Sequence, residues 1–318
     1  DNPKLPYIIK ILSHLFGDGH IALREYHGSY RGDFNFCGEL VDLEKIDSDL
    51  KNIGLNPLKI RKVESGGNIR FIHKEKIKER SIMGTSLLID ATSISFFCLF
   101  KALGAPIGKK TDIEFGVPQW IMNCSQGWVK QLFLASYFGS EMTKPGPQLS
   151  LKSFRTPYYS LNKREDLVDS GLEFVEDIKM LLNEFDIETL KVKAVPYCIR
   201  KDGKISKKIK VYLSNSTQNL INLYGKIGFE YSDRKEKVAG YVYAYLKQKQ
   251  KKLSKRLEVY DKAMDLSNDG LSNTEIFEKI GEEYPHVTQS TIYDWTSGKV
   301  KGELHMLSLS DAKFDTWL

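Results

Sequence analysis

Apolar residues recur at helical spacing in two short runs that resemble each other. The first run is ILSHLFGDG at residues 11–19, and the second is LASYFGSEM at residues 134–142. Each run reaches a carboxylate where its helix is expected to stop, Asp18 in the first and Glu141 in the second. Because a helix C-terminus carries partial negative charge, an acid is disfavoured there. The pattern predicts two helices whose terminal acids serve a purpose other than helix stability.

The patterns that follow the two runs also repeat. Each run precedes an alternating, aromatic-rich stretch and a helical stretch, at 20–38 and 40–55 in the first case and at 148–163 and 167–185 in the second. Each copy closes with a helix that stops at a glycine. Gly104 lies 86 residues after Asp18, and Gly228 lies 87 residues after Glu141. We therefore predict an α+β fold with two copies of an α-β-β-α-β-β-α unit, over residues 5–117 and 127–237.

The remaining chain predicts an all-α tail, so the expected domains are 1–117, 118–237 and 238–318. Residues 238–262 have the pattern of one long basic helix. The stretch from 270 to 298 has the layout of a helix-turn-helix. Ser272 with Glu275 forms a capping-box pattern, Thr288 suits a second N-cap, and Gly298 suits a helix stop. The expected small core of this tail consists of Ile276, Ile280, Ile292 and Trp295.

Composition narrows the class of protein. Neither a membrane span nor a secretory signal is recognisable in the 318 residues, which predicts a cytoplasmic protein. The four cysteines lie far apart without a C-x-x-C pair, which argues against a zinc site and a disulfide framework. The net charge of +6 is segregated. Residues 191–210 hold eight Lys or Arg against one Asp, and residues 165–188 hold nine acids against one Lys, so we expect surfaces of opposite charge.

Small residues in both runs predict how the two helices meet. Ser13 and Gly17 are four residues apart, as are Ser136 and Ser140, so each helix has a narrow face that another backbone can approach. Packing these faces together places Asp18 and Glu141 near a pseudo-twofold axis. A divalent cation removes the repulsion between two acids, and Mg²⁺ prefers carboxylate, water and phosphate oxygens. An Asp before Gly is also a common turn residue, but Glu141 is followed by Met142, so turn chemistry does not explain both copies.

The two runs resemble the motif of LAGLIDADG homing endonucleases, with Asp18 and Glu141 at the metal-binding position. Residues 103–121, LGAPIGKKTDIEFGVPQWI, resemble the block that precedes the second motif in archaeal-type intein endonucleases. The resemblance covers residues 5–237 and implies a DNA-binding saddle of two four-stranded antiparallel sheets. It also implies that Mg²⁺, or another divalent cation such as Mn²⁺ or Ca²⁺, is held by Asp18 and Glu141. The implied activity is cleavage of both strands of a long double-stranded DNA site, leaving short 3′ overhangs, by a monomer.

The family also implies a basic residue near the cleaved phosphate, and Lys110 and Lys235, in the basic loops that close the two units, are our predictions. Lys109 and Lys237 stay open as alternatives. His14 and His20 are not expected to bind metal, because hard cations prefer oxygen and no histidine recurs in the second copy. Alternation along residues 20–26 and 207–213 predicts strands with one buried and one DNA-facing side. The predicted DNA contacts of the saddle and tail are Arg24, Tyr26, Lys152, Arg155, Lys193, Lys208, Lys210, Lys249, Lys252, Gln289, Ser290 and Tyr293.

Three functions remain open from the sequence. The first is an active homing endonuclease, which retention of both acids favours. The second is a non-cleaving transcription regulator with a LAGLIDADG-like saddle and a helix-turn-helix. The third is an RNA maturase on the same scaffold. Protein splicing is not expected, because residue 1 is Asp and the end reads DAKFDTWL, without the His-Asn pair of a splice junction.

Overall fold

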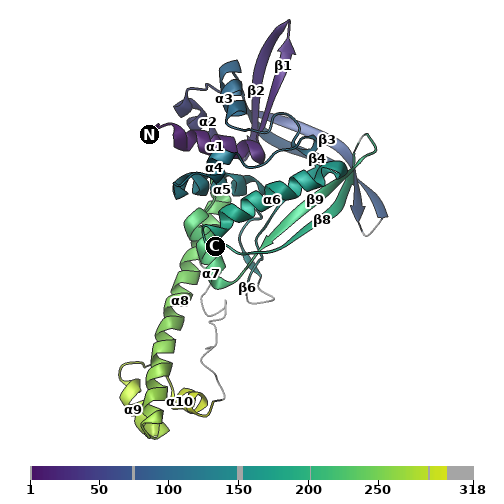
Figure 1. Cartoon of the computed structure of the whole chain (residues 1–318). Coiled ribbons are helices and arrows are strands. Elements are labelled where there is room, and N and C mark those ends of the chain that lie inside the picture. Colours follow the sequence, from purple (N-terminus) through teal and green to yellow (C-terminus); the bar gives the residue numbers. More distant parts are fainter. Residues whose placement is uncertain (1, 74–75, 149–152, 201, 286, 299–318) are drawn as a thin grey trace. The chain divides into compact units, whose positions relative to one another are not determined.

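The computed structural model describes every residue except 1, 74–75, 149–152, 201, 286 and 299–318 (Figure 1). The chain divides into two compact units. The first, called here the sheet unit, holds residues 1–147 and 154–240, and the second, the helical unit, holds residues 148–153 and 241–318. None of the described helices combines the length and apolar composition needed to cross a bilayer.

The first half of the sheet unit has the element order expected from the sequence. In chain order it contains α1 (Leu5–Phe16), β1 (His20–Tyr26), β2 (Ser29–Gly38), α2 (Leu40–Ile53), β3 (Arg61–His73), β4 (Lys76–Thr92) and α3 (Ile94–Ala102). A loop with the short helices η1 (Lys110–Asp112) and α4 (Gln119–Met122) leads to the second half.

The second half contains α5 (Gly127–Glu141), β5 (Pro147–Gln148), β6 (Ser153–Phe154), β7 (Tyr158–Arg164), η3 (Glu165–Leu167), α6 (Val168–Asn183), β8 (Thr189–Ile199), β9 (Ile205–Leu213), α7 (Thr217–Asn222) and the π-helical turn η4 (Leu223–Ile227). Of the strand pair expected over residues 148–163, residues 149–152 lie outside the described residues, β7 is present, and β5 and β6 form a separate two-stranded sheet.

The main sheet is continuous, whereas the family resemblance implied two sheets of four strands. Its seven strands run in the order β1-β2-β4-β3-β8-β9-β7. Among the described residues, the two halves join between β3 and β8 through the pairs Arg70 with Ile199 and Phe71 with Cys198. The described sheet is thus α+β and antiparallel, with four strands from the first half and three from the second.

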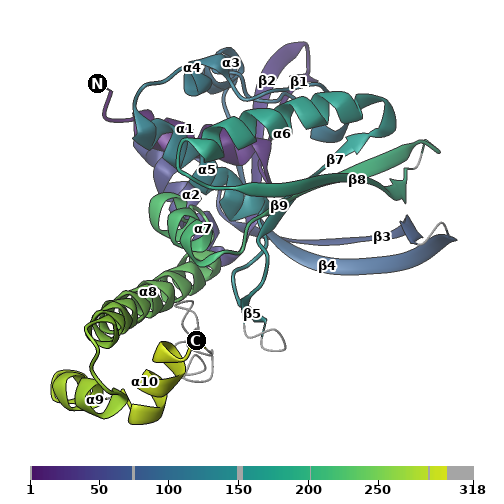
Figure 2. The same cartoon turned by 60° about the horizontal axis from the view of Figure 1, so that its bottom comes forward.

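Alternation in β9 and in the second part of β2 puts apolar side chains on the helix-covered face of the sheet, whereas β3, β8 and most of β4 are largely exposed. Phe34 and Phe36 of β2 are fully buried, and so are Ile209, Val211 and Leu213 of β9. The expected alternation holds in β9 but ends early in β1, where Ile21 is buried and Leu23 is 43% exposed. α1 and α5 lie side by side over this core (Figures 1 and 2). Side chains of the opposite parity form what we call the open face of the sheet.

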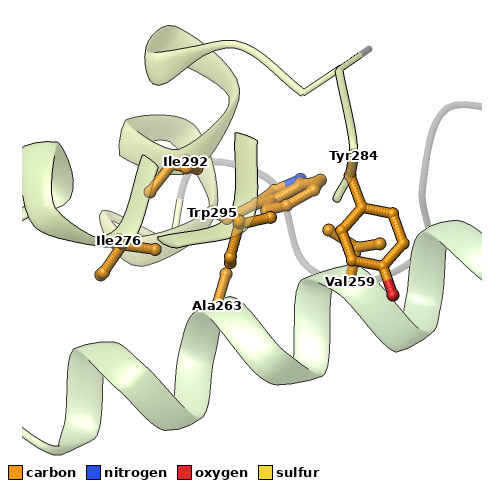
Figure 3. Packing of buried hydrophobic residues seen from close by; sticks show 7 residues of the cluster. Val259, Ala263, Ile276, Tyr284, Ile292 and Trp295 are labelled. Atoms are coloured by element: carbon orange, nitrogen blue, oxygen red, sulfur yellow. The ribbon is translucent and has the colours of Figure 1, made fainter. Parts of the chain in front are cut away.

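The tail is helical, and its first helix is longer than the expected 238–262. α8 spans Asp233–Asn268 and is followed by α9 (Asn273–Gly281) and α10 (Gln289–Thr296). The capping box of Ser272 and Glu275 forms as predicted, and the Thr288 side chain accepts from the Thr291 backbone N–H at the start of α10. The predicted core residues Ile276, Ile280, Ile292 and Trp295 are at most 1% exposed. Figure 3 shows Val259 and Ala263 of α8 completing this core, together with Tyr284.

Candidate functional site

Two reciprocal hydrogen bonds join α1 to α5. The Ser13 hydroxyl donates to the carbonyl oxygen of Phe133 at 2.5 Å, and the Ser136 hydroxyl donates to the carbonyl oxygen of Lys10 at 2.7 Å. Each donor lies three residues after the residue that accepts on its own helix, so the two bonds are related by a local twofold axis. Only small side chains let two helix backbones approach closely enough for such bonds. The predicted packing of the serine-containing faces is therefore present.

The same close approach continues to the ends of the two helices. A Cβ atom added at Gly17 would lie 2.5 Å from Cβ of Ser140 and 3.6 Å from Cγ of Glu141. One at Gly139 would lie 1.8 Å from the carbonyl oxygen of Glu230. Glycine is thus required at these two positions for space. The consequence is that the backbone just before Asp18 lies against Glu141.

Met142 has a different role from Gly19, its counterpart in the first motif. A Cβ atom at Gly19 would lie 2.9 Å from the His14 carbonyl oxygen, so a side chain does not fit there. Met142 instead has extended backbone (φ −82°, ψ 146°), is 2% exposed, and forms an isolated bridge with Tyr159. The departure from glycine in the second motif therefore leaves Glu141 at the end of α5 without strain.

The two acids differ in exposure, and the pKa of Glu141 is shifted. Asp18 is exposed and Glu141 is half-buried. Burial is the main reason that the pKa of Glu141 is raised to about 7, and the negative charge of Asp18 adds to it, against the opposing effect of Lys110 and Lys235. A nearby like charge and a low dielectric both disfavour the ionised form. The site therefore holds a carboxylate pair that the protein's own cations neutralise only in part.

Lys110 and Lys235 occupy equivalent places beside these acids. The Lys110 ammonium donates to the carbonyl oxygens of Leu15, Gly17 and Gly19, with distances of 3.2 Å to the first and 2.6 Å to the last. The Lys235 ammonium donates to those of Phe138, Gly139 and Ser140 at 3.4, 2.6 and 3.1 Å. Burial lowers the pKa of both lysines, and both acids act in the opposite direction. Both lysines thus close a helix C-terminus, where unpaired carbonyls attract cations.

The alternative lysines, Lys109 and Lys237, form ion pairs near the surface, and the two histidines are wholly or partly buried. Lys109 pairs with Asp112 at 3.2 Å and Lys237 with Asp233 at 2.8 Å, both on exposed surface. His14 is buried, its Nδ1 lies 2.9 Å from the Ser140 hydroxyl, and burial with the two neighbouring lysines lowers its pKa to about 3. Burial also lowers the pKa of the partly exposed His20. Among the described residues, no group of three or more His, Cys, Asp or Glu side chains is arranged to hold a metal.

The open face of the first half carries arginines, of which the sequence predicted only Arg24. Arg24 and Arg31 are direct cross-strand neighbours, and Asp33 bonds to both. Tyr26 is 61% exposed, with the Arg31 guanidinium 5.5 Å from its ring centre. A second pair, Arg61 with Asp90, lies on the same face. Sequence patterns did not identify Arg31, Asp33, Arg61 and Asp90, because cross-strand register becomes known only in the folded sheet.

The open face of the second half carries lysines set against tyrosine rings. The Lys208 ammonium lies 3.9 Å from the centre of the Tyr197 ring, and that of Lys210 lies 5.6 Å from the Tyr158 ring. Lys193, directly opposite Lys210, is exposed, and the neighbouring Lys191 lies 5.0 Å from the Tyr212 ring. These predicted contacts thus share one surface. Arg155 is exposed near β7, and Lys152 lies outside the described residues.

The predicted contacts in the helical unit lie on its surface. Gln289, Ser290 and Tyr293 are exposed, and the Gln289 amide donates to the Thr274 hydroxyl at 2.9 Å. Lys249 is half-buried, which lowers its pKa, and Lys252 is exposed. A groove beside α8 is lined by residues that include Lys252, Lys255, Arg256, Tyr284 and Thr291. A basic surface therefore exists in this unit too.

Comparison with known proteins finds sequence relatives whose names describe unrelated proteins. No known protein-family model matches the chain. It is 34% identical over 256 residues to the DNA-directed RNA polymerase subunit Rpo1N of Methanocaldococcus jannaschii, which covers 80% of this chain and 18% of that protein. It is 31% identical over 288 residues to the tRNA-splicing ligase RtcB of the same organism, covering 87% of this chain and 27% of the ligase. With the RtcB of Methanopyrus kandleri, identity is 29% over 285 residues, 88% of this chain and 26% of the ligase.

The chain therefore spans about a quarter or less of the length of these relatives. Among solved structures, it is similar to the homing endonuclease I-WcaI bound to its DNA recognition sequence, with TM-score 0.36 and 13% identity over 70% of this chain and 80% of that one. It is also similar to the LAGLIDADG homing endonuclease I-GzeII in complex with its DNA target, with TM-score 0.37 and 11% identity over 89% of this chain and 98% of that one. Because TM-scores below 0.5 do not establish a common fold, neither likeness assigns the chain to a family.

Proposed function

We propose that this chain is a divalent-metal-dependent DNA endonuclease that hydrolyses a phosphodiester bond in each strand of a long double-stranded site, leaving short 3′ overhangs, and that it acts as a monomer. One observation carries the proposal. Two helices locked by the Ser13 and Ser136 hydrogen bonds bring Asp18 and Glu141 together at the start of a basic sheet face. No requirement of the fold explains two acids there, because each lies at the negative end of a helix.

The residues present fit a divalent cation. The pKa of Glu141, raised to about 7 by burial and by the charge of Asp18, marks a carboxylate pair that lacks sufficient positive charge. Mg²⁺ commonly uses one or two protein carboxylates and completes its shell with water and phosphate oxygens, so a site without a third acidic ligand suits it. Asp18 and Glu141 would hold the ion, and Mn²⁺ or Ca²⁺ could replace it. When bound, such an ion activates water and stabilises charge on the phosphate.

The other groups at the site would orient the acids and the DNA. Lys110 and Lys235 fix the two helix ends by their bonds to backbone carbonyls, and their positive charges lie close to both acids. In this arrangement they support the site and add positive potential near a phosphate. The open faces of the two sheet halves, with their arginines and lysines, would bind DNA on either side of the acids. The basic surface of the helical unit would add contacts with the phosphate backbone.

The sequence relatives support the inference that this chain corresponds to a segment that occurs inside larger proteins of different activity. An RNA polymerase subunit and a tRNA-splicing ligase each align with at least 80% of this chain but with 18% and 27% of their own length. Each relative therefore aligns with this chain through only one segment of its length, and neither named activity transfers to this chain. An inserted, intein-type endonuclease segment accounts for such matches. In this proposal the chain is that segment and is neither a polymerase nor a ligase fragment.

A cleavage selection on randomised double-stranded DNA with Mg²⁺ tests the proposal. Wild type should recover a long, specific site cut in both strands, and Asp18→Asn and Glu141→Gln should lose cutting while still binding that site. Asp47→Asn, which removes a partly exposed carboxylate of α2 that pairs with Lys51, is the matched control and should cut normally. Tight, specific binding without cutting by wild type would mean a regulator. Preferential binding of structured intron RNA would mean a maturase.

A further inference from the structure

The two halves of the sheet hold their cationic side chains in different ways. In the first half, the Arg31 guanidinium pairs side-on with Asp33, through Nε at 2.7 Å and Nη2 at 3.2 Å. Arg24 reaches the same carboxylate through Nε at 3.2 Å, and the Thr92 hydroxyl donates to it at 3.4 Å. The side chain of Asp33 is only 9% exposed, whereas those of Arg24 and Arg31 are 60% and 46% exposed. A nearly buried acid thus anchors two exposed arginines.

A second cluster on the same face repeats this design. Nε and Nη2 of Arg61 both lie 2.7 Å from Oδ2 of Asp90, and the Asn35 amide donates to its Oδ1 at 2.5 Å. The side chain of Asp90 is 15% exposed and that of Arg61 is 56% exposed. Asn35 is two residues from Asp33 on β2 and directly opposite Asp90 on β4, so the two clusters are neighbours. Three arginines on one sheet face are therefore fixed by two carboxylates.

Stability does not explain these clusters. Arg24 and Arg31 are directly opposite each other on neighbouring strands, where like charges are destabilising. The arginine ends of these ion pairs are about half exposed, so solvent screens the pairs and limits what they contribute to stability. What the side-on geometry does provide is orientation. Because Nε and Nη2 face the carboxylate, the Nη1 amino group points away from it, and the long side chain has already lost most of its freedom before any ligand binds.

The open face of the second half offers mainly point charges, although Arg164 at the end of β7 is also held side-on, by Asp166. Lys191, Lys208 and Lys210 lie over tyrosine rings, and within the described residues none of these three forms a salt bridge with a carboxylate. An ammonium has no planar fork, so it attracts phosphates without selecting a base edge. A tyrosine ring beside the ammonium can pack on the sugars of the DNA backbone. The guanidinium fork, in contrast, matches the O6 and N7 acceptors of guanine in the major groove.

We propose that Asp33 and Asp90 are positioning residues that preorganise Arg24, Arg31 and Arg61 to read guanines, so that base selectivity concentrates in the half-site under β1–β4. The lysine and tyrosine face of β7–β9 binds the other half-site mainly through phosphates and sugars. This inference rests on the proposed function, since it requires that the open face binds DNA. It adds to that function an asymmetry between half-sites, which the symmetric element order of the two halves does not require.

Binding selection on a randomised double-stranded DNA library, with EDTA to prevent cutting, tests the asymmetry. With the full chain, Asp33→Asn and Arg31→Lys should each lower the preference for guanine about tenfold at a few adjacent base pairs on one side of the site centre. Arg31→Lys keeps the charge and spares the buried acid, so it remains informative if Asp33→Asn folds poorly. Lys208→Gln with Lys210→Gln should weaken binding to all sequences alike and reduce the slope of log Kd against log salt by about one for each lysine.

The outcomes separate the two levels of the proposal. If wild type binds every DNA sequence equally, the proposed function fails and the inference fails with it. If wild type is selective but Arg31→Lys and Asp33→Asn keep its base preferences, only the inference is overturned. It is also overturned if the lysine pair changes base preferences more than the arginine variants do. Asp47→Asn serves as the control for removal of a partly exposed carboxylate and should match wild type.

Discussion

Lys110 and Lys235 close the carbonyl ends of α1 and α5 in the same way, although they lie 125 residues apart. Lys110 begins η1 and Lys235 lies in the first turn of α8, whereas the sequence predicted loops at both positions. Each ammonium lies within hydrogen-bonding distance of three backbone carbonyl oxygens at the end of one helix. A helix leaves its last carbonyls without intrahelical partners, and the residues that carry most of these carbonyls are buried. The two lysines thereby hold the backbone that carries Asp18 and Glu141.

Replacing either lysine should therefore destabilise the protein even without metal or DNA. Lys110→Met leaves buried carbonyl oxygens unpaired, and we expect the free energy of unfolding to fall by roughly 1–3 kcal/mol. Urea unfolding of the metal-free protein measures this change. Lys109→Met is the neighbouring control, because Lys109 forms only an exposed pair with Asp112, and its effect should stay within about 1 kcal/mol. Equal effects of the two substitutions would contradict the capping role.

Gly139 provides a test of the close packing at the end of α5. A Cβ atom there would lie 1.8 Å from the carbonyl oxygen of Glu230, so Gly139→Ala forces the backbone apart. We expect it to lower the free energy of unfolding by about 1–3 kcal/mol and to impair DNA cutting. The control is Gly240→Ala in α8, where a Cβ atom meets nothing within 4 Å. That substitution should raise stability by roughly 0.5–1 kcal/mol, because alanine favours helix. Thermal unfolding of both variants decides whether space or helix propensity dominates.

Local patterns predicted the helices, the acids and the caps. Helical spacing with small residues was sufficient to identify the α1–α5 contact, since residues four apart share a face whatever the tertiary fold. Ser272 and Thr288 were predicted as caps because capping bonds span only three residues. The metal role of Asp18 and Glu141 and the DNA contacts remain predictions.

The sequence did not predict features that depend on the pairing register between strands. Asp33 reaches Arg24 only because residue 24 of β1 pairs with residue 31 of β2. Likewise, the β3–β8 junction that joins the sheet halves involves two residue pairs without a distinctive motif.

The buried residue Lys163 should make the free energy of unfolding depend on pH. Its fully buried ammonium donates to the Ile113 carbonyl oxygen at 2.6 Å and lies 3.7 Å from the centre of the Phe115 ring. Burial lowers its pKa to about 8 from 10.5. The folded state thus loses the proton before the unfolded state does, so the cost of the buried charge is complete below pH 8 and is relieved as pH rises from about 8 to 10.5.

Stability relative to Lys163→Met should consequently rise with pH. Between pH 7 and pH 10.5, the free energy of unfolding of wild type should increase by about 1–3 kcal/mol relative to that variant. Denaturant unfolding at the two pH values measures this difference, and taking it between variants removes the effects of other titrating groups. Lys207→Met, which removes a partly exposed lysine paired with Glu165, should show no such trend. If the free energy of unfolding of wild type relative to Lys163→Met is the same at both pH values, burial does not disfavour the charged form of Lys163.

Magnesium should stabilise the protein through Asp18 and Glu141. An ion that binds only the folded state at about a hundred times its Kd adds about 2.7 kcal/mol to the free energy of unfolding. Glu141 has a pKa of about 7 without metal, so below that pH the ion must displace a proton. We therefore expect Kd for Mg²⁺ to rise about tenfold for each pH unit below 7 and to change little above it.

Thermal unfolding with and without Mg²⁺ at pH 6 and pH 8 checks this expectation. Wild type should gain more stability from Mg²⁺ at pH 8 than at pH 6. Asp18→Asn should gain little at either pH, because one oxygen ligand and one negative charge are lost. Glu141→Gln should also gain little, and its small gain should not depend on pH, since the group that exchanges a proton for the metal is absent. Asp47→Asn, which removes a partly exposed carboxylate of α2, should behave as wild type. If Glu141→Gln gains as much as wild type, the ion is bound elsewhere and the composite site of two helix ends is wrong.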